Sequence, residues 1–407
     1  MNSTQADVVV IGAGVLGTSC AFHLADAGVQ NVVVLDRGTI GGGTTQFAAG
    51  QTGHLRSNRI SLEFTSYCAD FFENFEDKTG HAVDFHQYGS LRIALTEAYV
   101  TDLEQRVEAA KSIGQKTHYL SVPEALKLVP SLRLEPTAQI LLSPRDGFVE
   151  PRSVAVAYAA AAIDRGARIL TGTAVEDVLT SGGRVRGVQT SIGVIETERV
   201  VLAAGAWTRL LGERFGLNIQ VVPVRHQLYV TAPLSCVRAD QPIVRITEPQ
   251  LYARQHMGGL MVGGYGYRPM SFKMEDFPED FEIPALSADH IYYQEMHEAA
   301  LPFFPDLEKV PIVEQRRGLP TMAPDGQSIA SNIEGLDGLI VASACSVGGV
   351  HHSPGIGRIV ADIVTGRPKW LPADGLSAAR FGSEFDDNTQ LREACEAVYA
   401  RMYRDKI

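Results

Sequence analysis

The sequence contains few cysteines and no long apolar run. Its five cysteines among 407 residues are scattered and never closely paired, at Cys20, Cys68, Cys236, Cys345 and Cys395. This spacing predicts reduced thiols rather than a disulfide framework or a zinc site. No apolar stretch approaches the roughly 18 residues that a membrane-spanning helix needs. No basic segment precedes the first apolar run, so we expect no secretory or transit signal and a cytoplasmic protein.

The chain also lacks an excess of positive charge. It carries 36 Lys and Arg against 47 Asp and Glu, which gives a formal net charge of −11. Proteins that wrap nucleic acid or lie on anionic membranes depend on clustered Lys and Arg, so the charge argues against both classes. The length predicts two to three domains. Because no repeat and no linker rich in Pro, Gly or Ser separates them, we expect the domains to be interleaved.

The N-terminal residues follow the order strand, turn, helix, strand. Asp7 to Ile11 (DVVVI) is a short β-branched run typical of a buried parallel strand. The sequence GAGVLG follows directly at residues 12–17, and Leu16, Cys20 and Leu24 then recur at helical spacing. Val32 to Leu35 gives a second strand that ends at Asp36. This order is that of a dinucleotide-binding unit.

Each glycine of the turn has a separate physical role in such a unit. Gly12 permits the tight turn, Gly14 leaves room for a pyrophosphate at the helix N-terminus, and Gly17 lets the helix lie close to the strand. Asp36 is placed to accept hydrogen bonds from the ribose of an adenosine. An acid at this position disfavours an adenosine 2′-phosphate, so FAD or NAD is preferred to NADP.

The remainder of the chain favours FAD, because it does not continue as regular strand–helix units. A loop of small residues fills 41–50, and helices are predicted at 103–113, from Ser121, at 152–165 and at 287–300. Ser121 and Glu124 have the spacing of a capping box. Short strands separated by glycine-rich turns follow residue 168, and those between 221 and 264 predict an antiparallel sheet. The expected fold is therefore mixed α/β.

Several motifs together resemble those of the D-amino-acid oxidase superfamily of FAD enzymes, in the branch of glycine oxidase, sarcosine oxidase and dimethylglycine dehydrogenase. Besides the N-terminal fingerprint they are DGFVEP at 146–151, AAGAW at 203–207, PVRHQ at 223–227, PDG at 324–326 and SVGGVHHSPGIG at 346–357. In order and spacing they cover nearly the whole chain. The resemblance implies a Rossmann-like FAD-binding domain interleaved with an antiparallel-sheet substrate domain.

The resemblance also implies domain ranges and cofactor contacts. The FAD-binding domain is expected at 1–85, 146–220 and 320–375, the substrate domain at 86–145 and 221–319, and a C-terminal helical tail at 376–407. The residues expected to bind FAD are Gly12, Gly14, Val15, Leu16, Asp36, Arg37, Thr44, Thr45, Ala49, Gly50, Val175, Ala204, Gly205, Trp207, Gly348, Gly349, Val350 and His351. A glycine-rich turn opening a helix from Gly355 to Val364 would face the flavin with its positive end.

The sequence departs from its relatives at four places. Phe47 and Gly318 stand where some relatives attach FAD covalently through His or Cys, so non-covalent FAD is expected. Leu319 begins the segment LPT, where many relatives place an arginine that binds the substrate carboxylate; Arg316, Arg317, Arg254 and Arg56 are the available replacements. Met261 stands where some sarcosine oxidases have a lysine that assists reaction with oxygen, which leaves oxidase and dehydrogenase both open.

The substrate side is expected to use four residues. Tyr252 and Arg254 share one face of an alternating strand, and a hydroxyl beside a guanidinium suits a carboxylate. His54 and His352 lie in segments that should pass the flavin, where each is a candidate substrate contact or proton acceptor. No His or Cys spacing suggests a metal site.

The resemblance implies oxidation of a secondary amine or an amino acid by hydride transfer to the flavin, which gives an imine. Oxygen or a redox partner would accept the electrons. Two alternatives stay open at this point: oxidation of a 2-hydroxy acid, with His54 or His352 as base, and a non-catalytic FAD-binding subunit whose substrate site has decayed. The sequence does not specify the substrate or the oligomeric state.

Overall fold

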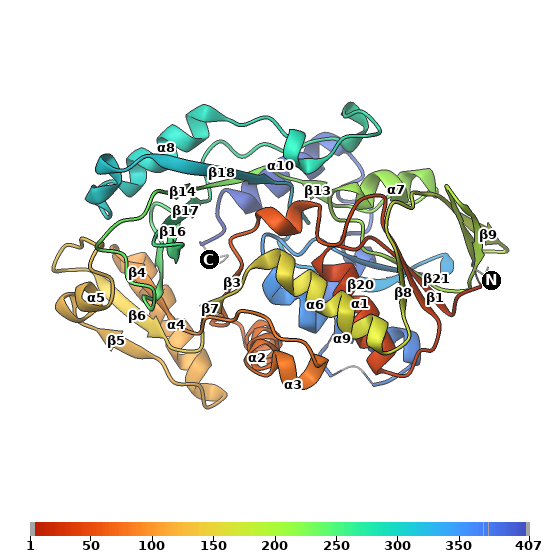
Figure 1. Ribbon diagram of the computed structural model, residues 1–407, viewed down its shortest axis with the longest axis horizontal. Coiled ribbons are helices and arrows are strands. Elements are labelled where there is room, and N and C mark those ends of the chain that lie inside the picture. Colours follow the sequence, from red (N-terminus) through yellow and green to blue (C-terminus); the bar gives the residue numbers. More distant parts are fainter. Residues whose placement is uncertain (1–4, 369, 373, 404–407) are drawn as a thin grey trace.

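The computed structural model describes residues 5–368, 370–372 and 374–403. Two large sheets lie at opposite ends of an elongated molecule, and helices fill the space between and around them (Figure 1). The chain crosses from one sheet to the other several times. This arrangement confirms the mixed α/β fold expected from the sequence.

The first sheet has nine strands, of which five form a parallel core in the order β21-β12-β1-β2-β8. Its strands are β1 (Val8–Ile11), β2 (Val32–Leu35), β8 (Arg168–Leu170), β9 (Val175–Ser181), β10 (Arg184–Thr190), β11 (Gly193–Glu196), β12 (Val200–Leu202), β20 (Ile329–Ile333) and β21 (Leu336–Ser343). Alternate residues of β1 and β2 pack into two different hydrophobic clusters, one on each face. A sheet buried on both faces explains why these strands are apolar throughout.

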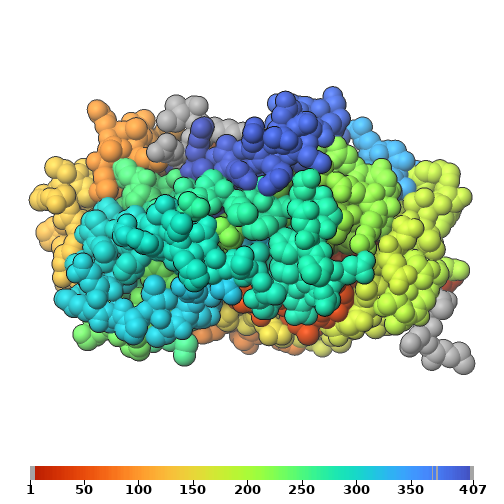
Figure 2. Space-filling view, turned by 90° about the horizontal axis from the view of Figure 1, so that it is seen from above, coloured from red at the N-terminus to blue at the C-terminus, as the bar shows by residue number. Residues whose placement is uncertain are grey.

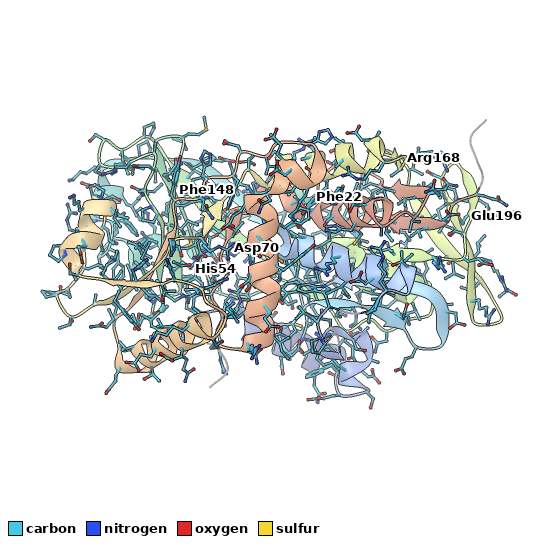
Figure 3. The ribbon with its side chains drawn as sticks, turned by 90° about the horizontal axis from the view of Figure 1, so that it is seen from below. Phe22, His54, Asp70, Phe148, Arg168 and Glu196 are labelled. Atoms are coloured by element: carbon cyan, nitrogen blue, oxygen red, sulfur yellow. The ribbon has the colours of Figure 1, made fainter. Side chains whose placement is uncertain are left out.

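Three helices, α1 (Val15–Asp26), α6 (Pro151–Asp164) and α9 (Gly349–Thr365), pack together in the cluster on one face of this sheet. Helix α2 (Arg59–Glu73) packs against α9 and crosses the middle of the molecule, where Asp70 is labelled between His54 and Phe22 (Figure 3). Helices α3 (Phe75–Thr79) and α7 (Thr208–Arg214) are short.

The second sheet has eight strands in the order β18-β14-β17-β16-β15-β4-β6-β5. Their bounds are β4 (Ser90–Ala94), β5 (His118–Leu120), β6 (Gln139–Ser143), β14 (His226–Thr231), β15 (Ile243–Ile246), β16 (Leu251–His256), β17 (Gly259–Gly264) and β18 (Ile312–Gly318). All pairs are antiparallel except β4 with β15, which is parallel and joins segments about 150 residues apart. The strands of this sheet fall inside the ranges expected for the substrate domain.

One face of the second sheet packs on helices, and the other faces the centre of the molecule. Helices α5 (Val122–Leu128) and α8 (His290–Ala300) cover the outer face in a hydrophobic cluster, while α4 (Glu97–Ser112) packs against β4. The capping box of α5 is confirmed: the Ser121 N–H donates to Glu124 Oε2 at 2.7 Å.

The C-terminal segment closes the side of the molecule between the two sheets. Helix α10 (Asn388–Tyr399) contacts the short strands β13 (Val222–Pro223) and β19 (Thr321–Met322), which pair with each other. Figure 2 shows this dark blue segment along the upper edge of the molecule, over the middle of its length. A second short pair, β3 (Gln51–Thr52) with β7 (Gly147–Phe148), joins the small-residue loop to the DGF motif.

Two helices begin several residues earlier than the sequence predicts. Helix α4 begins at Glu97 rather than at 103, and α9 begins at Gly349 rather than at Gly355 and contains Pro354. Proline lacks the N–H that would bond to the carbonyl of Val350, four residues earlier. The Ser353 hydroxyl donates to that carbonyl at 2.8 Å instead, so the helix continues through the proline.

Candidate functional site

One continuous cavity of about 2360 Å³, lined by residues that the structure describes, lies between the two sheets. Ordinary small-molecule pockets measure roughly 300–1,000 Å³, so this space accommodates more than one small ligand. Every residue that the sequence analysis assigned to FAD lines it, from Gly12 in the first turn to His351 in α9. The substrate-side candidates Tyr252 and His352 also line it, whereas His54 and Arg254 do not.

The glycine-rich turn has the geometry that the motif predicts. Gly12 has φ +108°, and a Cβ there would lie 2.4 Å from the carbonyl oxygen of Ala203. A Cβ at Gly17 would lie 1.8 Å from the carbonyl oxygen of Gly12, so only glycine lets the helix approach this closely. At Gly14 a Cβ would meet nothing nearer than the Thr45 hydroxyl at 3.5 Å. Packing of the protein itself therefore does not require glycine at position 14, which lines the cavity.

Asp36 braces this turn at the edge of the cavity. Its Oδ2 accepts a hydrogen bond from the Ala13 N–H at 2.6 Å, and its Oδ1 accepts one from the Gly38 N–H at 2.7 Å. A carboxylate oxygen has further acceptor capacity beyond one bond. Asp36 can thus hold the turn and still accept hydroxyl hydrogen bonds.

Arg37 and Trp207 close the same end of the cavity. The Arg37 guanidinium lies 4.3 Å from the centre of the Trp207 ring and donates to the carbonyls of Glu279, at 2.7 Å, and of Phe281. These contacts fasten the segment carrying the short 3-10 turns Met274–Asp276 and Ile283–Ala285 to the first sheet. A segment from the substrate half therefore covers the nucleotide end.

The turn before α9 is strained and opens onto the cavity. Ala344, Ser346 and Val347 all have positive φ, at 54°, 42° and 61°. Such values are costly for residues with a Cβ, above all for a β-branched one, and they cluster at functional sites. Thr321 holds the turn: its carbonyl accepts from the Ser346 N–H and its hydroxyl from the Ala344 N–H, both at 3.1 Å.

The N-termini of α1 and α9 both reach the cavity through a glycine. Gly14 and Gly348 are the N-cap residues, and neither has a side chain that could cap its helix, although the Val15 N–H of α1 donates to Thr45 Oγ1 at 3.2 Å. The uncapped N–H groups and the positive end of a helix dipole suit anionic groups. Together with the open space at Gly14, this donor set fits a dinucleotide such as FAD.

At the second sheet, the cavity is bordered by a row of side chains in register. Tyr252 on β16 pairs with Arg245 on β15, and Arg245 pairs with Arg92 on β4. All three line the cavity. Their neighbours along each strand, such as Leu91 and Val244, point into the hydrophobic cluster on the opposite face. The alternation of these strands therefore gives the cavity a polar wall.

A hydrogen-bond chain runs from the cavity into the core through Tyr252. The Tyr252 hydroxyl lies 2.8 Å from His226 Nε2, and His226 Nδ1 lies 2.8 Å from the Tyr399 hydroxyl. The Tyr399 hydroxyl lies 3.2 Å from that of Tyr292, which donates to the Gly264 carbonyl at 2.6 Å. Burial lowers the pKa of His226 to about 4, so this imidazole is neutral at neutral pH.

A carbonyl at the inner end fixes the direction of this chain. Since Gly264 can only accept, Tyr292 donates to it, Tyr399 donates to Tyr292, and His226 donates from Nδ1 to Tyr399. His226 Nε2 is then the acceptor for the Tyr252 O–H. The Tyr252 oxygen keeps its lone pairs free toward the cavity, where it can accept a hydrogen bond from a ligand.

His54 and Arg254 lie behind the cavity wall. His54 is 1% exposed and its Nδ1 lies 2.6 Å from Asp146 Oδ1; it sits beside α2 in Figure 3. Arg254 Nε donates to the Ala49 carbonyl at 2.8 Å, and its guanidinium lies 4.5 Å from the centre of the Phe148 ring. Arg254 thus ties the second sheet to the small-residue loop.

The two histidines of α9 lie at the cavity as neutral rings. Burial lowers the pKa of His352 to about 3 and places that of His351 well below its usual value. Within the described residues, neither ring nitrogen of His351 has a hydrogen-bond partner. Of the other candidate arginines, Arg56 lines the cavity, while Arg316 and Arg317 do not.

Sequence reasoning missed Arg92, Arg245 and Tyr265, all of which line the cavity, and assigned His226 no role. The PVRHQ motif contains His226, which was the available signal. Arg92 and Arg245 gave no local signal because they meet only through the parallel pairing of β4 with β15. Over the described ranges, no helix is long and apolar enough to cross a membrane, and no group of three His, Cys, Asp or Glu could hold a metal ion.

The fold and the cavity are those of a dinucleotide-binding protein whose cavity continues from the glycine-rich turn to the second sheet. The chain belongs to the family described as "FAD dependent oxidoreductase" (DAO), whose model matches residues 7–363. The resemblance expected from the sequence is therefore confirmed.

Three similar proteins indicate the range of this family. Mitochondrial dimethylglycine dehydrogenase of Mus musculus is 30% identical over 374 residues, covering 89% of this chain and 43% of that protein. The mitochondrial pyruvate dehydrogenase phosphatase regulatory subunit of Mus musculus is 28% identical over 407 residues, covering 99% of this chain and 46% of that protein. The chain thus spans less than half the length of these two relatives. The crystal structure of L-proline dehydrogenase from P. horikoshii has a TM-score of 0.85 at 25% identity, covering 94% of this chain and 99% of that one.

Proposed function

We propose that the protein oxidises a secondary amine or an amino acid to an imine with bound FAD. The observation that carries this proposal is the continuous cavity that joins the dinucleotide-binding turn to the Tyr252–His226 chain. A related dehydrogenase of dimethylglycine and one of L-proline support an amine substrate.

When bound, FAD supplies the chemistry by accepting a hydrogen with its electron pair from the carbon beside the amine nitrogen. The nitrogen lone pair then forms the C=N bond of the imine, so the amine has to enter this step deprotonated. Water hydrolyses the imine to a carbonyl compound and the smaller amine. Oxygen or a redox partner takes up the two electrons.

The residues of this chain prepare the amine and hold the cofactor. The Tyr252 oxygen accepts a hydrogen bond from an N–H of the amine, and His226 Nε2 orients the Tyr252 hydroxyl by accepting its O–H hydrogen bond. The ammonium form of the substrate loses its proton to water before the oxidation. The N-terminus of α9 lies at the cavity, where its N–H groups and positive dipole would stabilise anionic parts of FAD. The segment 274–285, fastened by Arg37, excludes water from the nucleotide end.

The FAD is held without a covalent bond. Phe47 and Gly318 lack a group that could bond to flavin, and a Cβ at 318 would lie 2.9 Å from the Thr44 methyl group. Cys345 is the cysteine that lines the cavity, and burial raises its pKa to about 11, so it stays a neutral thiol. The neutral thiol is a poor nucleophile.

Anaerobic titration of the FAD-loaded protein tests this function. The panel contains sarcosine, N,N-dimethylglycine, proline, glycine and 2-hydroxy acids. Bleaching of the flavin by an amine, with release of an aldehyde or a cyclic imine, supports the proposal. Bleaching by hydroxy acids alone would point to the alternative oxidation, and no bleaching by any compound would favour a non-catalytic subunit.

The cytoplasmic location stays a prediction, because the two curated relatives compared above are mitochondrial proteins.

A further inference from the structure

Two arginines lie side by side on the cavity face of the second sheet. Arg92 and Arg245 are register partners on the parallel strands β4 and β15, and Tyr252 is the next residue in the same row. Like charges placed opposite each other in a sheet are destabilising. Two adjacent arginines of this kind therefore lower the stability of the sheet unless a negatively charged group binds beside them.

The carboxylates near Arg92 and Arg245 do not pair with both arginines. Arg245 Nη1 donates to Asp146 Oδ2 at 3.0 Å, and the neighbouring Arg106 donates from Nε to Asp102 at 2.8 Å. Arg92 forms no ion pair with any carboxylate in the described part of the chain, and its Nη1 is buried there without a hydrogen-bond partner. Burial, followed by the charges of Arg106 and Arg245, lowers the pKa of Arg92 to about 9, so it remains a cation at neutral pH.

Aromatic rings fill the space between this cation and the His226 chain. The ring centre of Tyr265 lies 5.2 Å from that of His226, 5.8 Å from that of Tyr252 and 5.2 Å from that of Tyr403. Arg92 lies 5.3 Å from the centre of the Tyr403 ring. The part of the cavity along the second sheet therefore has an aromatic end, which suits alkylated ammonium groups, and a cationic end, which suits an anion.

We propose that Arg92, with Arg245 beside it, binds the carboxylate of the substrate, which makes the substrate an amino acid or N-alkyl amino acid rather than a simple amine. This inference rests on the proposed function and specifies its substrate class. Adjacent strands lie about 4.8 Å apart, so Tyr252 and Arg92 are about 10 Å apart at the backbone. Both side chains line the cavity, from the two strands that flank β15.

Arg92 fits this role better than the arginines that the sequence suggested. The Arg254 guanidinium is committed to the carbonyls of Ala49 and Gln255 and lies outside the cavity lining. Arg56 lines the cavity, but its Nη1 donates to the carbonyls of Gly53 and Leu55. Arg316 and Arg317 also have a buried donor without a partner, but neither lines the cavity. Arg92 lines the cavity, has an unsatisfied donor and forms no ion pair with a carboxylate of the described residues.

Matched ligand pairs test the carboxylate directly. Sarcosine, N,N-dimethylglycine and proline are each compared with their primary amides, which keep the amine and the size but lose the negative charge. Each acid and each amide is titrated into the FAD-loaded wild type and into Arg92→Met. Anaerobic bleaching of the flavin gives the affinity for each compound, and calorimetry gives the same affinity without requiring turnover.

We expect the wild type to prefer the acid over its amide by roughly 30-fold or more, because a buried charge pair contributes on this scale. Arg92→Met should reduce the preference to nearly none, and Arg92→Lys should keep part of it. Arg254→Met, which removes a guanidinium from the same sheet outside the cavity, serves as the matched control and should leave the ratio unchanged. An unaltered ratio in Arg92→Met, or equal affinities in the wild type, would overturn the proposal.

A stability measurement separates a binding role from a structural one. Because Arg92 is a desolvated cation among like charges, Arg92→Met should leave the melting temperature unchanged or raise it. A fall of several degrees would mean that Arg92 supports the fold. If no compound bleaches the flavin, the proposed function fails. Calorimetry then tests the carboxylate site by itself. Acids that bind the wild type but not Arg92→Met would support the site, and acids that bind neither protein would contradict it.

Discussion

The ring of Tyr252 occupies the space that a side chain at Gly263 would need. The two residues are register partners on β16 and β17, and a Cβ at Gly263 would lie 2.1 Å from the Tyr252 hydroxyl oxygen. Glycine at 263 therefore sets the position of the hydroxyl that borders both the cavity and His226.

Gly263→Ala should consequently displace Tyr252 and break its hydrogen bond to His226. We expect flavin reduction by the best substrate to slow about as much as in Tyr252→Phe, which keeps the ring and removes only the hydroxyl. Rapid-mixing absorbance measures both rates. If Gly263→Ala reduces the flavin as fast as wild type while Tyr252→Phe does not, the hydroxyl does not depend on this space.

Two glycines of the N-terminal turn should respond differently to valine. Gly14→Val places its side chain where the protein leaves open space, so the apoprotein should fold but fail to retain FAD. Gly17→Val would collide with the Gly12 carbonyl, so it should lower the stability of the apoprotein itself. Flavin content and thermal melting of both variants check this. Stoichiometric FAD in Gly14→Val would contradict the assignment of the turn.

Acid precipitation should release the flavin from the polypeptide. The reason is the absence of an attachment residue at Phe47 and Gly318 and the neutral thiol of Cys345. The supernatant is assayed for FAD by chromatography. Yellow colour that stays with the pellet would show covalent attachment at another residue.

Buried neutral histidines should make stability depend on pH. Burial lowers the pKa of His23 and of His226 to about 4, whereas histidine in an unfolded chain titrates near 6.5. Between these values the unfolded chain binds protons that the native state does not. The free energy of unfolding should therefore be largest above pH 6.5 and fall, by a few kcal/mol per histidine, as the pH drops toward 4.

Denaturant unfolding at pH 7 and pH 5 measures this effect. His23→Gln provides the comparison, since it removes one such group far from Tyr252 and should flatten the dependence. An equal slope in wild type and variant would mean that His23 is not the neutral buried group described here.

The local elements of the fold were predictable from the sequence, but the substrate end of the site was not. The unit from β1 to Asp36 and the α5 capping box follow from neighbouring residues, so periodicity and cap chemistry sufficed to find them. The alternation of residues along β16 predicted that Tyr252 and Arg254 share one face of the sheet. Only Tyr252 lines the cavity, because the Arg254 guanidinium donates to the Ala49 carbonyl instead. Arg92 becomes a neighbour of Arg245 through a pairing that no local pattern specifies.

The start of α9 illustrates a second limit. The sequence predicted a glycine-rich turn followed by a helix that begins at Gly355, but the helix continues through Pro354, where the Ser353 hydroxyl supplies the missing hydrogen bond to Val350. A side chain that replaces a backbone donor is visible only in the structure. The consequence is that His351 and His352 lie within the helix at the cavity rather than in a loop that precedes it.

The most direct test of the central claim is anaerobic titration of the FAD-loaded protein with N-alkyl amino acids. The account predicts complete bleaching of the flavin at one substrate molecule per flavin for at least one of them, since each oxidation delivers two electrons. It also predicts recovery of the oxidised spectrum when an electron acceptor is added. A flavin that keeps its oxidised spectrum with every amine and amino acid tested would contradict the claim that this cavity oxidises amines.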